Sequence, residues 1–475
     1  MYDIIVIGGG VIGGCILREL SKYNLRPCML EKEDDVATGQ SRANSGIVHA
    51  GFDAQEGTLK AKFNVEGNKM MSAYCKELGV KYENNGSLVL AFSDDDIETL
   101  GKLKARGERN GVDGLQILTA EELRTLELNI SERALGALYA PTGGIVCPYG
   151  LTIASIGNAI DNGADLKTNF CVTAIAKNRD GSFKVTAADG REAEAKILVN
   201  CAGLGSGRIA SLLGDDSVKV FPRKGEYILL DRESGGYVRH TVFTAPTRLG
   251  KGVLVSQTVD GNIIVGPTAE EKDGTETSAA GLETVIQKAK EIYPELPLYN
   301  TITSFAGVRA YSAGHDFIIE ESNAVKGLVN VAGIESPGLT SAPAIAKYVA
   351  EEIVGKMLPL SANESFNGTR TPEHFFKELS VEEKNALIKK EPAYGKIVCR
   401  CEQITEGEIL RAVRENPPAR SVDAVKRRTR AGMGRCQGGF CQPHVAEILS
   451  RELHIPFEEV TKSGKGSELV LGVTK

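Results

Sequence analysis

Four of the ten cysteines of this chain gather near its C-terminal end, where their spacing suits metal chemistry. They form two close pairs, Cys399 with Cys401 and Cys436 with Cys441. Zinc sites normally use two C-x-x-C knuckles, and the C-x-C spacing of the first pair is a poor match to them. Four thiolates in two pairs suit a [2Fe-2S] centre. A zinc site and a metal-free thiol cluster are the alternatives.

A glycine turn near the N-terminus has the spacing that binds a dinucleotide. Gly8, Gly10 and Gly13 follow a short β-branched strand that begins at Tyr2. The first glycine permits a tight turn, the second lets the backbone approach a pyrophosphate, and the third lets the next helix pack on the strand. The following apolar strand ends at Glu31, whose carboxylate can accept ribose hydroxyls. An ordinary glycine turn is the alternative.

Two further residues could accept a proton and bind an anion, respectively. His49 lies in a polar, glycine-rich loop from Asp34 to Phe52, which is too long for an idle turn. Because imidazole titrates near neutral pH, this histidine could accept a proton. Arg309 lies on an expected strand, and its planar guanidinium can bind a phosphate or carboxylate in two places. A structural loop histidine and a surface ion pair are the alternatives.

The elements that must position these residues follow from the periodicity. Helical spacing is expected over seven segments: 58–78, 94–109, 119–126, 151–162, 339–354, 381–390 and 445–453. Short strands are expected over 166–175, 183–187, 197–202, 304–310, 315–320 and 328–332. Residues 219–265 alternate as long strands, which predicts an antiparallel sheet. Five cations lie there, and as a set they favour an anionic substrate: Arg223, Lys224, Arg239, Arg248 and Lys251.

The segment Asn44-Ser-Gly-Ile-Val-His-Ala-Gly51, followed by Gly57-Thr-Leu-Lys-Ala, resembles FAD enzymes of the glycine and D-amino acid oxidase type. Within that family it is most similar to the branch of glycerol-3-phosphate dehydrogenases and oxidases and L-2-hydroxyglutarate oxidases. The resemblance covers about residues 2–355. It implies that His49 faces the flavin and the substrate carbinol, and that Arg309 holds the substrate anion.

The same resemblance implies the residues that bind FAD. A second helix N-terminus, after the strand at 328–332, should point at the flavin and stabilise negative charge on the reduced ring. The implied residues are Gly8, Gly10, Val11, Ile12, Gly13, Glu31, Lys32, Thr38, Ser41, Asn44, Ser45, Gly46, Val172, Ala202, Gly203, Gly333, Gly338, Leu339 and Thr340.

The C-terminal cysteine region resembles the ferredoxin module associated with bacterioferritin, which is also fused to anaerobic glycerol-3-phosphate dehydrogenase subunits. The similar stretches surround Cys401, Cys436 and Cys441, although the second pair is spaced more widely than C-x-x-C. The basic run Lys426–Arg430 precedes that pair. We expect it either to raise the reduction potential of the cluster or to form a docking face for an acidic partner.

These features predict an α/β (α+β) protein with three parts. A Rossmann-like FAD-binding domain and an antiparallel-sheet substrate domain are expected within 1–355. The FAD-binding parts are about 1–80, 145–215 and 325–355, and the substrate parts are about 81–144 and 216–324. A linker over 356–395 leads to a small helical [2Fe-2S] module at 396–455, followed by a tail at 456–475.

The resemblance implies a dehydrogenase that oxidises sn-glycerol 3-phosphate to dihydroxyacetone phosphate. The phosphate would be held by Arg309 and Lys251, and His49 would take the hydroxyl proton while a hydride goes to the flavin. Electrons would leave through the [2Fe-2S] cluster to a partner subunit in a hetero-oligomer. The alternatives are an L-2-hydroxyglutarate dehydrogenase and an electron-transfer or redox-sensing subunit without a substrate of its own.

Composition limits the environment of the protein. The net charge of −6 gives no reason to expect nucleic acid. No run reaches the eighteen or so apolar residues of a transmembrane segment, and the first strand leaves no room for a signal peptide. We therefore expect a cytoplasmic protein that reaches a membrane only through a partner.

Overall fold

The computed structural model describes residues 1–246, 252–371 and 375–472. The N-terminal strand β1 (Tyr2–Ile7) lies inside an eight-stranded sheet. Its apolar side chains, including Ile4 and Val6, are fully buried, as expected for a strand covered on both faces. Five strands of this sheet run parallel: β9 (Asp165–Lys167), β2 (Pro27–Leu30), β1, β12 (Glu192–Asn200) and β19 (Leu328–Ala332). The Rossmann-like fold is confirmed.

Three antiparallel strands extend the parallel sheet: β10 (Val172–Lys177), β11 (Phe183–Ala187) and β18 (Ile318–Glu321). The single strand expected over 166–175 is therefore wrong, because it divides into β9 and β10. Between them, Asn169 adopts a positive φ of 51°, and the Phe170 N–H bonds to the Glu31 carbonyl. This break turns the chain past the end of β2.

Four helices pack against one another beside the sheet, in one apolar cluster: α1 (Val11–Leu20), α2 (Leu59–Leu78), α5 (Pro148–Asp161) and α8 (Gly338–Tyr348). The expected helix 339–354 is α-helical only as far as Tyr348. It continues as a π-helical turn over Val349–Ile353 and a 3-10 turn to Lys356. The short helix α6 (Ser206–Ser211) follows β12.

A second eight-stranded sheet packs beside the first body. Its order is β17 (Thr301–Ser312), β13 (Val220–Leu230), β16 (Ile263–Gly266), β15 (Leu254–Gln257), β14 (Thr241–Thr244), β5 (Ser87–Ala91), β7 (Gly136–Ala140) and β6 (Gln116–Thr119). All pairs are antiparallel, as predicted, except that β14 and β5 run parallel. The accompanying helices are α3 (Asp94–Asn110), α4 (Ala120–Leu126) and α7 (Ala279–Ile292), and α4 begins with a capping box of Thr119 and Glu122.

A three-stranded sheet joins the two larger sheets. It contains β3 (Ile47–Val48), β8 (Gly144–Val146) and β4 (Tyr82–Glu83). Strand β3 ends directly before His49, so this sheet fixes the start of the loop that carries the histidine.

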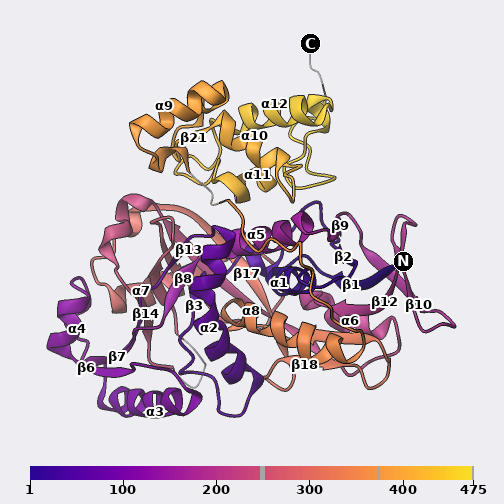
Figure 1. Ribbon diagram of the computed structural model, residues 1–475. Helices are drawn as coiled ribbons and strands as arrows, with labels where there is room; N and C mark the ends of the chain where they lie inside the picture. Colours follow the sequence, from indigo (N-terminus) through magenta and orange to yellow (C-terminus); the bar gives the residue numbers. More distant parts are fainter. Residues whose placement is uncertain (247–251, 372–374, 473–475) are drawn as a thin grey trace.

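The C-terminal residues build a small helical body with its own apolar core. It contains α9 (Val381–Lys390), β20 (Ile397–Cys399), β21 (Ile404–Thr405), α10 (Glu406–Arg414), α11 (Val422–Thr429) and α12 (Gln442–Leu453). Figure 1 shows these helices, in orange and yellow, resting on the larger body, where α11 contacts α5. A small helical module is therefore confirmed, whereas the boundaries assigned to the linker and the domains stay predictions.

Buried ion pairs hold this module against the larger body. Asp35 accepts hydrogen bonds from Arg427 at 2.5 Å and from Arg428 at 2.7 and 2.8 Å, and all three side chains are almost fully buried. Arg430 binds Asp260 at 2.7 Å. The expectation that the run Lys426–Arg430 offers a docking face to a separate partner is wrong for these three arginines, because they bind this chain's own acids.

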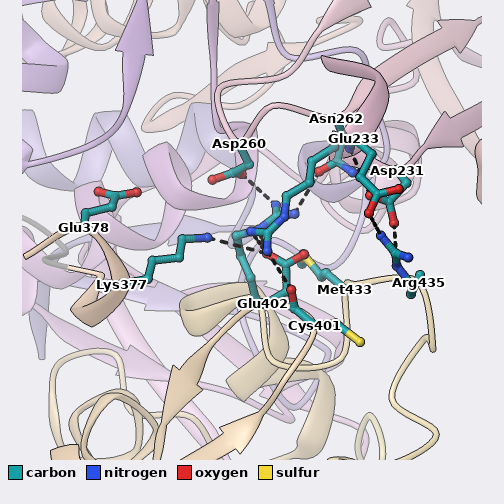
Figure 2. Close-up of polar contacts among 12 residues, drawn as sticks. Asp231, Glu233, Asp260, Asn262, Lys377, Glu378, Cys401, Glu402, Met433 and Arg435 are labelled. Carbon is teal, nitrogen blue, oxygen red and sulfur yellow. Dashed lines mark hydrogen bonds and ion pairs between the residues drawn. The ribbon is translucent and has the colours of Figure 1, made fainter. Parts of the chain in front are cut away.

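A second set of contacts surrounds the cysteine loops. Figure 2 shows Arg435 directed toward Asp231 and Glu233 of the larger body, and the Arg435–Asp231 distance is 3.2 Å. The carbonyl of Cys401 accepts a hydrogen bond of 2.7 Å from Arg232. Both cysteine loops are thus tied to the turn that follows β13, a strand of the sheet that carries Arg309.

Candidate active site and metal centre

The glycine turn has the close contacts that its spacing predicts. Gly8 has a φ of +112°, a conformation that side chains rarely adopt. A Cβ on Gly13 would lie 2.2 Å from the carbonyl oxygen of Gly8, so only glycine lets α1 approach β1 this closely. The first N–H of α1, from Val11, donates to Ser41 Oγ at 2.8 Å. Ser41 therefore ties the polar loop to the helix N-terminus.

Glu31 lies at the end of β2, beside the glycine turn. Its carboxylate accepts hydrogen bonds from the backbone N–H of Gly9 at 2.6 Å and of Glu33 at 2.9 Å. Burial raises the pKa of Glu31, and these two N–H groups only partly oppose that effect. The side chain is thus fixed in place at the end of the strand, where a ribose would lie.

One cavity of about 660 Å³ begins at the glycine turn and reaches the second sheet. Its wall includes most residues expected to bind the cofactor: Gly8, Gly10, Val11, Ile12, Glu31, Lys32, Thr38, Ser41, Asn44, Ser45, Val172, Ala202, Gly203, Gly333, Gly338 and Leu339. Three expected residues lie behind the wall. Gly13 packs on the glycine turn, a Cβ on Gly46 would lie 2.7 Å from the Val146 carbonyl oxygen, and Thr340 contacts His49.

His49 lines the cavity and is fixed through its backbone. Its N–H donates to Thr340 Oγ1 at 2.9 Å, and its carbonyl accepts from Asn64 at 2.6 Å and Asn68 at 3.1 Å. The imidazole ring lies 5.9 Å from the ring of Phe243, between centroids. These contacts hold the imidazole at the cavity wall.

Arg309 lines the same cavity from β17. It donates to the Thr268 carbonyl at 3.2 Å, while its Nε is buried with no hydrogen-bond partner among the described residues. A buried donor without a partner is costly, so a bound anion would satisfy it. A Cβ on Gly307 would lie 1.9 Å from the Ala43 carbonyl oxygen, so this glycine lets β17 approach the loop.

Three of the other cations of this sheet are described, and none of these three lines the cavity. Arg223 lies near Glu271 and Glu335, at 3.8 and 3.4 Å. Lys224 binds the fully buried Glu226 at 3.0 Å. Arg239 is exposed, and its backbone N–H donates to Glu127. Arg223 and Lys224 are therefore engaged by this chain's own acids, although Arg223 stands opposite Arg309 in the sheet. Arg248 and Lys251 lie outside the described residues.

Sequence reasoning missed several residues of the cavity wall, among them Tyr227, Phe243 and Arg427. Tyr227 and Phe243 come from strands of the second sheet, and Arg427 comes from the C-terminal module. Alternation along β13 and β14 could have indicated the two aromatics. No local signal could have placed Arg427, because its position depends on how the module docks.

The four C-terminal cysteines lie close together as two contacting pairs. Cys401 Sγ is 3.5 Å from Cys436 Sγ, and the Cys441 thiol bonds to Cys399. That hydrogen bond outweighs the effect of burial and lowers the pKa of Cys399 to about 6. In the described part of the chain, no three His, Cys, Asp or Glu side chains are arranged to hold a single metal ion. Two pairs of thiols instead fit a centre with two irons.

Comparisons with known proteins agree with these two sites. The FAD dependent oxidoreductase family model matches residues 3–352, and the BFD-like [2Fe-2S] binding domain model matches residues 397–451, which include all four cysteines. The chain is 48% identical to a glycerol 3-phosphate dehydrogenase of Caloramator mitchellensis over an alignment that covers 100% of this chain and 99% of that protein.

Two further similar proteins come from Mycoplasma pneumoniae. The chain is 33% identical to a glycerol 3-phosphate oxidase of Mycoplasma pneumoniae, with 73% of this chain and 92% of that protein covered. A structure of L-alpha-glycerophosphate oxidase from Mycoplasma pneumoniae, reduced with dithionite and with FAD bound, matches with a TM-score of 0.74 and 31% identity. That match covers 78% of this chain and 98% of the other.

The chain therefore belongs to the FAD dependent oxidoreductase family. It is an FAD-dependent oxidoreductase with a C-terminal [2Fe-2S] binding domain, so both predicted cofactors are confirmed. The glycine turn and the buried Arg309 Nε fit a dinucleotide and an anion, respectively. Among the described helices, none has the length and apolar character needed to cross a bilayer.

Proposed function

We propose that the enzyme oxidises sn-glycerol 3-phosphate to dihydroxyacetone phosphate. The observation that carries this proposal is that His49 and Arg309 line one cavity, and that Arg309 presents a buried donor without a partner among the described residues. An anionic group on the substrate would satisfy that donor. The full-length relative described as a glycerol 3-phosphate dehydrogenase supports the choice of substrate.

In this proposal, Arg309 binds the phosphate and His49 accepts the proton of the C2 hydroxyl. Thr340, Asn64 and Asn68 keep the imidazole in position through the backbone of His49. Bound FAD supplies the acceptor for the two electrons that leave C2 as a hydride. Lys251, which lies outside the described residues, remains a proposed second cation for the phosphate.

We also propose the path by which reducing equivalents leave. The four cysteines would hold the cluster, which can carry one electron at a time. An enzyme that reduces only dioxygen would have no use for such a centre, so we propose an acceptor protein in a larger assembly. Any attachment to a membrane would then come through that partner. The proposed units are residues 1–355 for the oxidation and 396–455 for the cluster.

An anaerobic titration of the holoenzyme tests the substrate. Glycerol 3-phosphate should bleach the flavin absorbance, whereas L-2-hydroxyglutarate should not. If only the hydroxy acid bleaches the flavin, the substrate is wrong but the site is right. If neither compound does, the chain has no hydroxy substrate of this kind, as an electron-transfer subunit would behave.

A further inference from the structure

The C-terminal module reaches into the FAD cavity. Arg427 of α11 lines that cavity although it belongs to the [2Fe-2S] domain, and its side chain is only 5% exposed. Ser463, which follows the last helix of the module, also lines the cavity. A Cβ on the next residue, Gly464, would lie 3.0 Å from Asp34 Cβ. The module thus closes the cavity beside the loop that follows Glu31.

Two buried polar atoms at this place lack partners among the described residues. One is Nε of Arg427, whose terminal nitrogen is bound to Asp35. The other is Oδ2 of Asp34, a residue that also lines the cavity. One atom is a donor and the other is an acceptor. Because leaving both groups unsatisfied is costly, a ligand that donates and accepts hydrogen bonds fits best.

The need for both a donor and an acceptor shows which part of FAD can bind at this place. A pyrophosphate only accepts hydrogen bonds, so it cannot satisfy a carboxylate oxygen. Ribose hydroxyls both donate and accept. Glu31, the residue suited to ribose hydroxyls, lies three positions before Asp34 in the same segment of chain. We infer that Arg427 and Asp34 contact the adenosine part of FAD, so that the [2Fe-2S] domain completes the flavin site.

The inference concerns a direct contact of Arg427 with the cofactor, whatever substrate the enzyme oxidises. Asp35 bonds to both Arg427 and Arg428, but Arg428 does not line the FAD cavity. Arg428 therefore shares the docking role of Arg427 without the contact to the cofactor. This pair offers a matched control within one ion-pair cluster.

Binding to the full-length apoprotein tests the inference, with FAD, ADP and FMN as probes. Arg427→Gln should weaken binding of FAD and ADP roughly ten- to a hundredfold, as expected for losing a hydrogen bond from a charged group. FMN, which lacks adenosine, should bind unchanged. Arg428→Gln should leave the ADP affinity close to that of the wild type.

A second variant keeps the test informative if Arg427→Gln does not fold. Asp34→Ala removes no ion pair with a residue that the structure describes, and it too should weaken ADP binding while the visible absorbance of the cluster stays intact. Equal losses of ADP affinity in Arg427→Gln and Arg428→Gln would overturn the inference, because docking alone would then explain them. Wild-type ADP affinity in a folded Asp34→Ala or Arg427→Gln protein would overturn it as well.

Discussion

The hydroxyl of Ser336 lies 3.3 Å from Nε2 of His49. Ser336 lies two residues before the start of α8. Thr340, in the first turn of that helix, holds the His49 backbone. The start of α8 therefore fixes both the main chain and the ring of a residue nearly three hundred positions away. A histidine that is incidental to the site would not need support of this kind from the second helix N-terminus beside the cavity.

Replacing His49 by Gln should slow turnover by roughly a hundredfold or more, because a positioned general base contributes rate of this order. FAD content should stay close to one per chain, since the histidine backbone contacts do not require an imidazole. Stopped-flow reduction of the flavin by glycerol 3-phosphate measures the effect. Unchanged flavin reduction would remove His49 from the proposed chemistry.

Replacing Arg309 by Gln should raise KM for glycerol 3-phosphate roughly tenfold to a hundredfold, because a charged hydrogen bond to the substrate anion is lost. The value of kcat should fall less than kcat/KM. Arg239→Gln is the matched control, because Arg239 is exposed and lies away from the cavity wall. A similar KM for wild type and Arg309→Gln would place the anion elsewhere.

Local chemistry explains which parts of the site the sequence could predict. The glycine turn depends on neighbours in one strand–helix unit, and Gly13 packs on Gly8 as its spacing indicates. The two cysteine pairs likewise follow from spacing within one small module. These features are set over short stretches, so their residue types carry the information.

Features that depend on how distant elements dock could not be predicted. The run Lys426–Arg430 looks like an exposed basic patch in the sequence, yet Arg427 and Arg428 bind Asp35, about four hundred residues earlier. The cations at Arg223 and Lys224 are ordinary strand residues, and only the ion pairs with Glu335 and Glu226 show that they serve the fold.

Replacing Cys436 by Ser should abolish the [2Fe-2S] absorbance and lower the iron content, because one of four thiolates is lost. Glycerol 3-phosphate should still bleach the flavin under anaerobic conditions. Reduction of a one-electron protein acceptor, however, should stop. Cys75→Ala, which changes a buried cysteine outside both sites, should keep both chromophores. Continued reduction of the acceptor without the cluster would contradict the proposed path.

The ion pair at Asp35 should make stability depend on acid pH. Burial alone would raise the pKa of this carboxyl, but Arg428 and Arg427 outweigh it and lower the pKa from 3.8 to about 2. A group with a depressed pKa in the folded state stabilises the protein above its unfolded value, and this contribution is lost as pH falls from about 4 toward 2. The shift corresponds to about 2 kcal/mol.

Denaturant unfolding of wild type and Asp35→Asn should therefore differ most near neutral pH and converge as the pH approaches 2. At neutral pH the variant should lose about 3 kcal/mol, because Arg427 and Arg428 stay buried without their carboxylate. Tyrosine fluorescence can follow unfolding, since the chain has no tryptophan. Asp113→Asn, at an exposed pair with Lys69, should show no comparable change. A stability difference that does not depend on pH would show that Asp35 is not the charged anchor of the module.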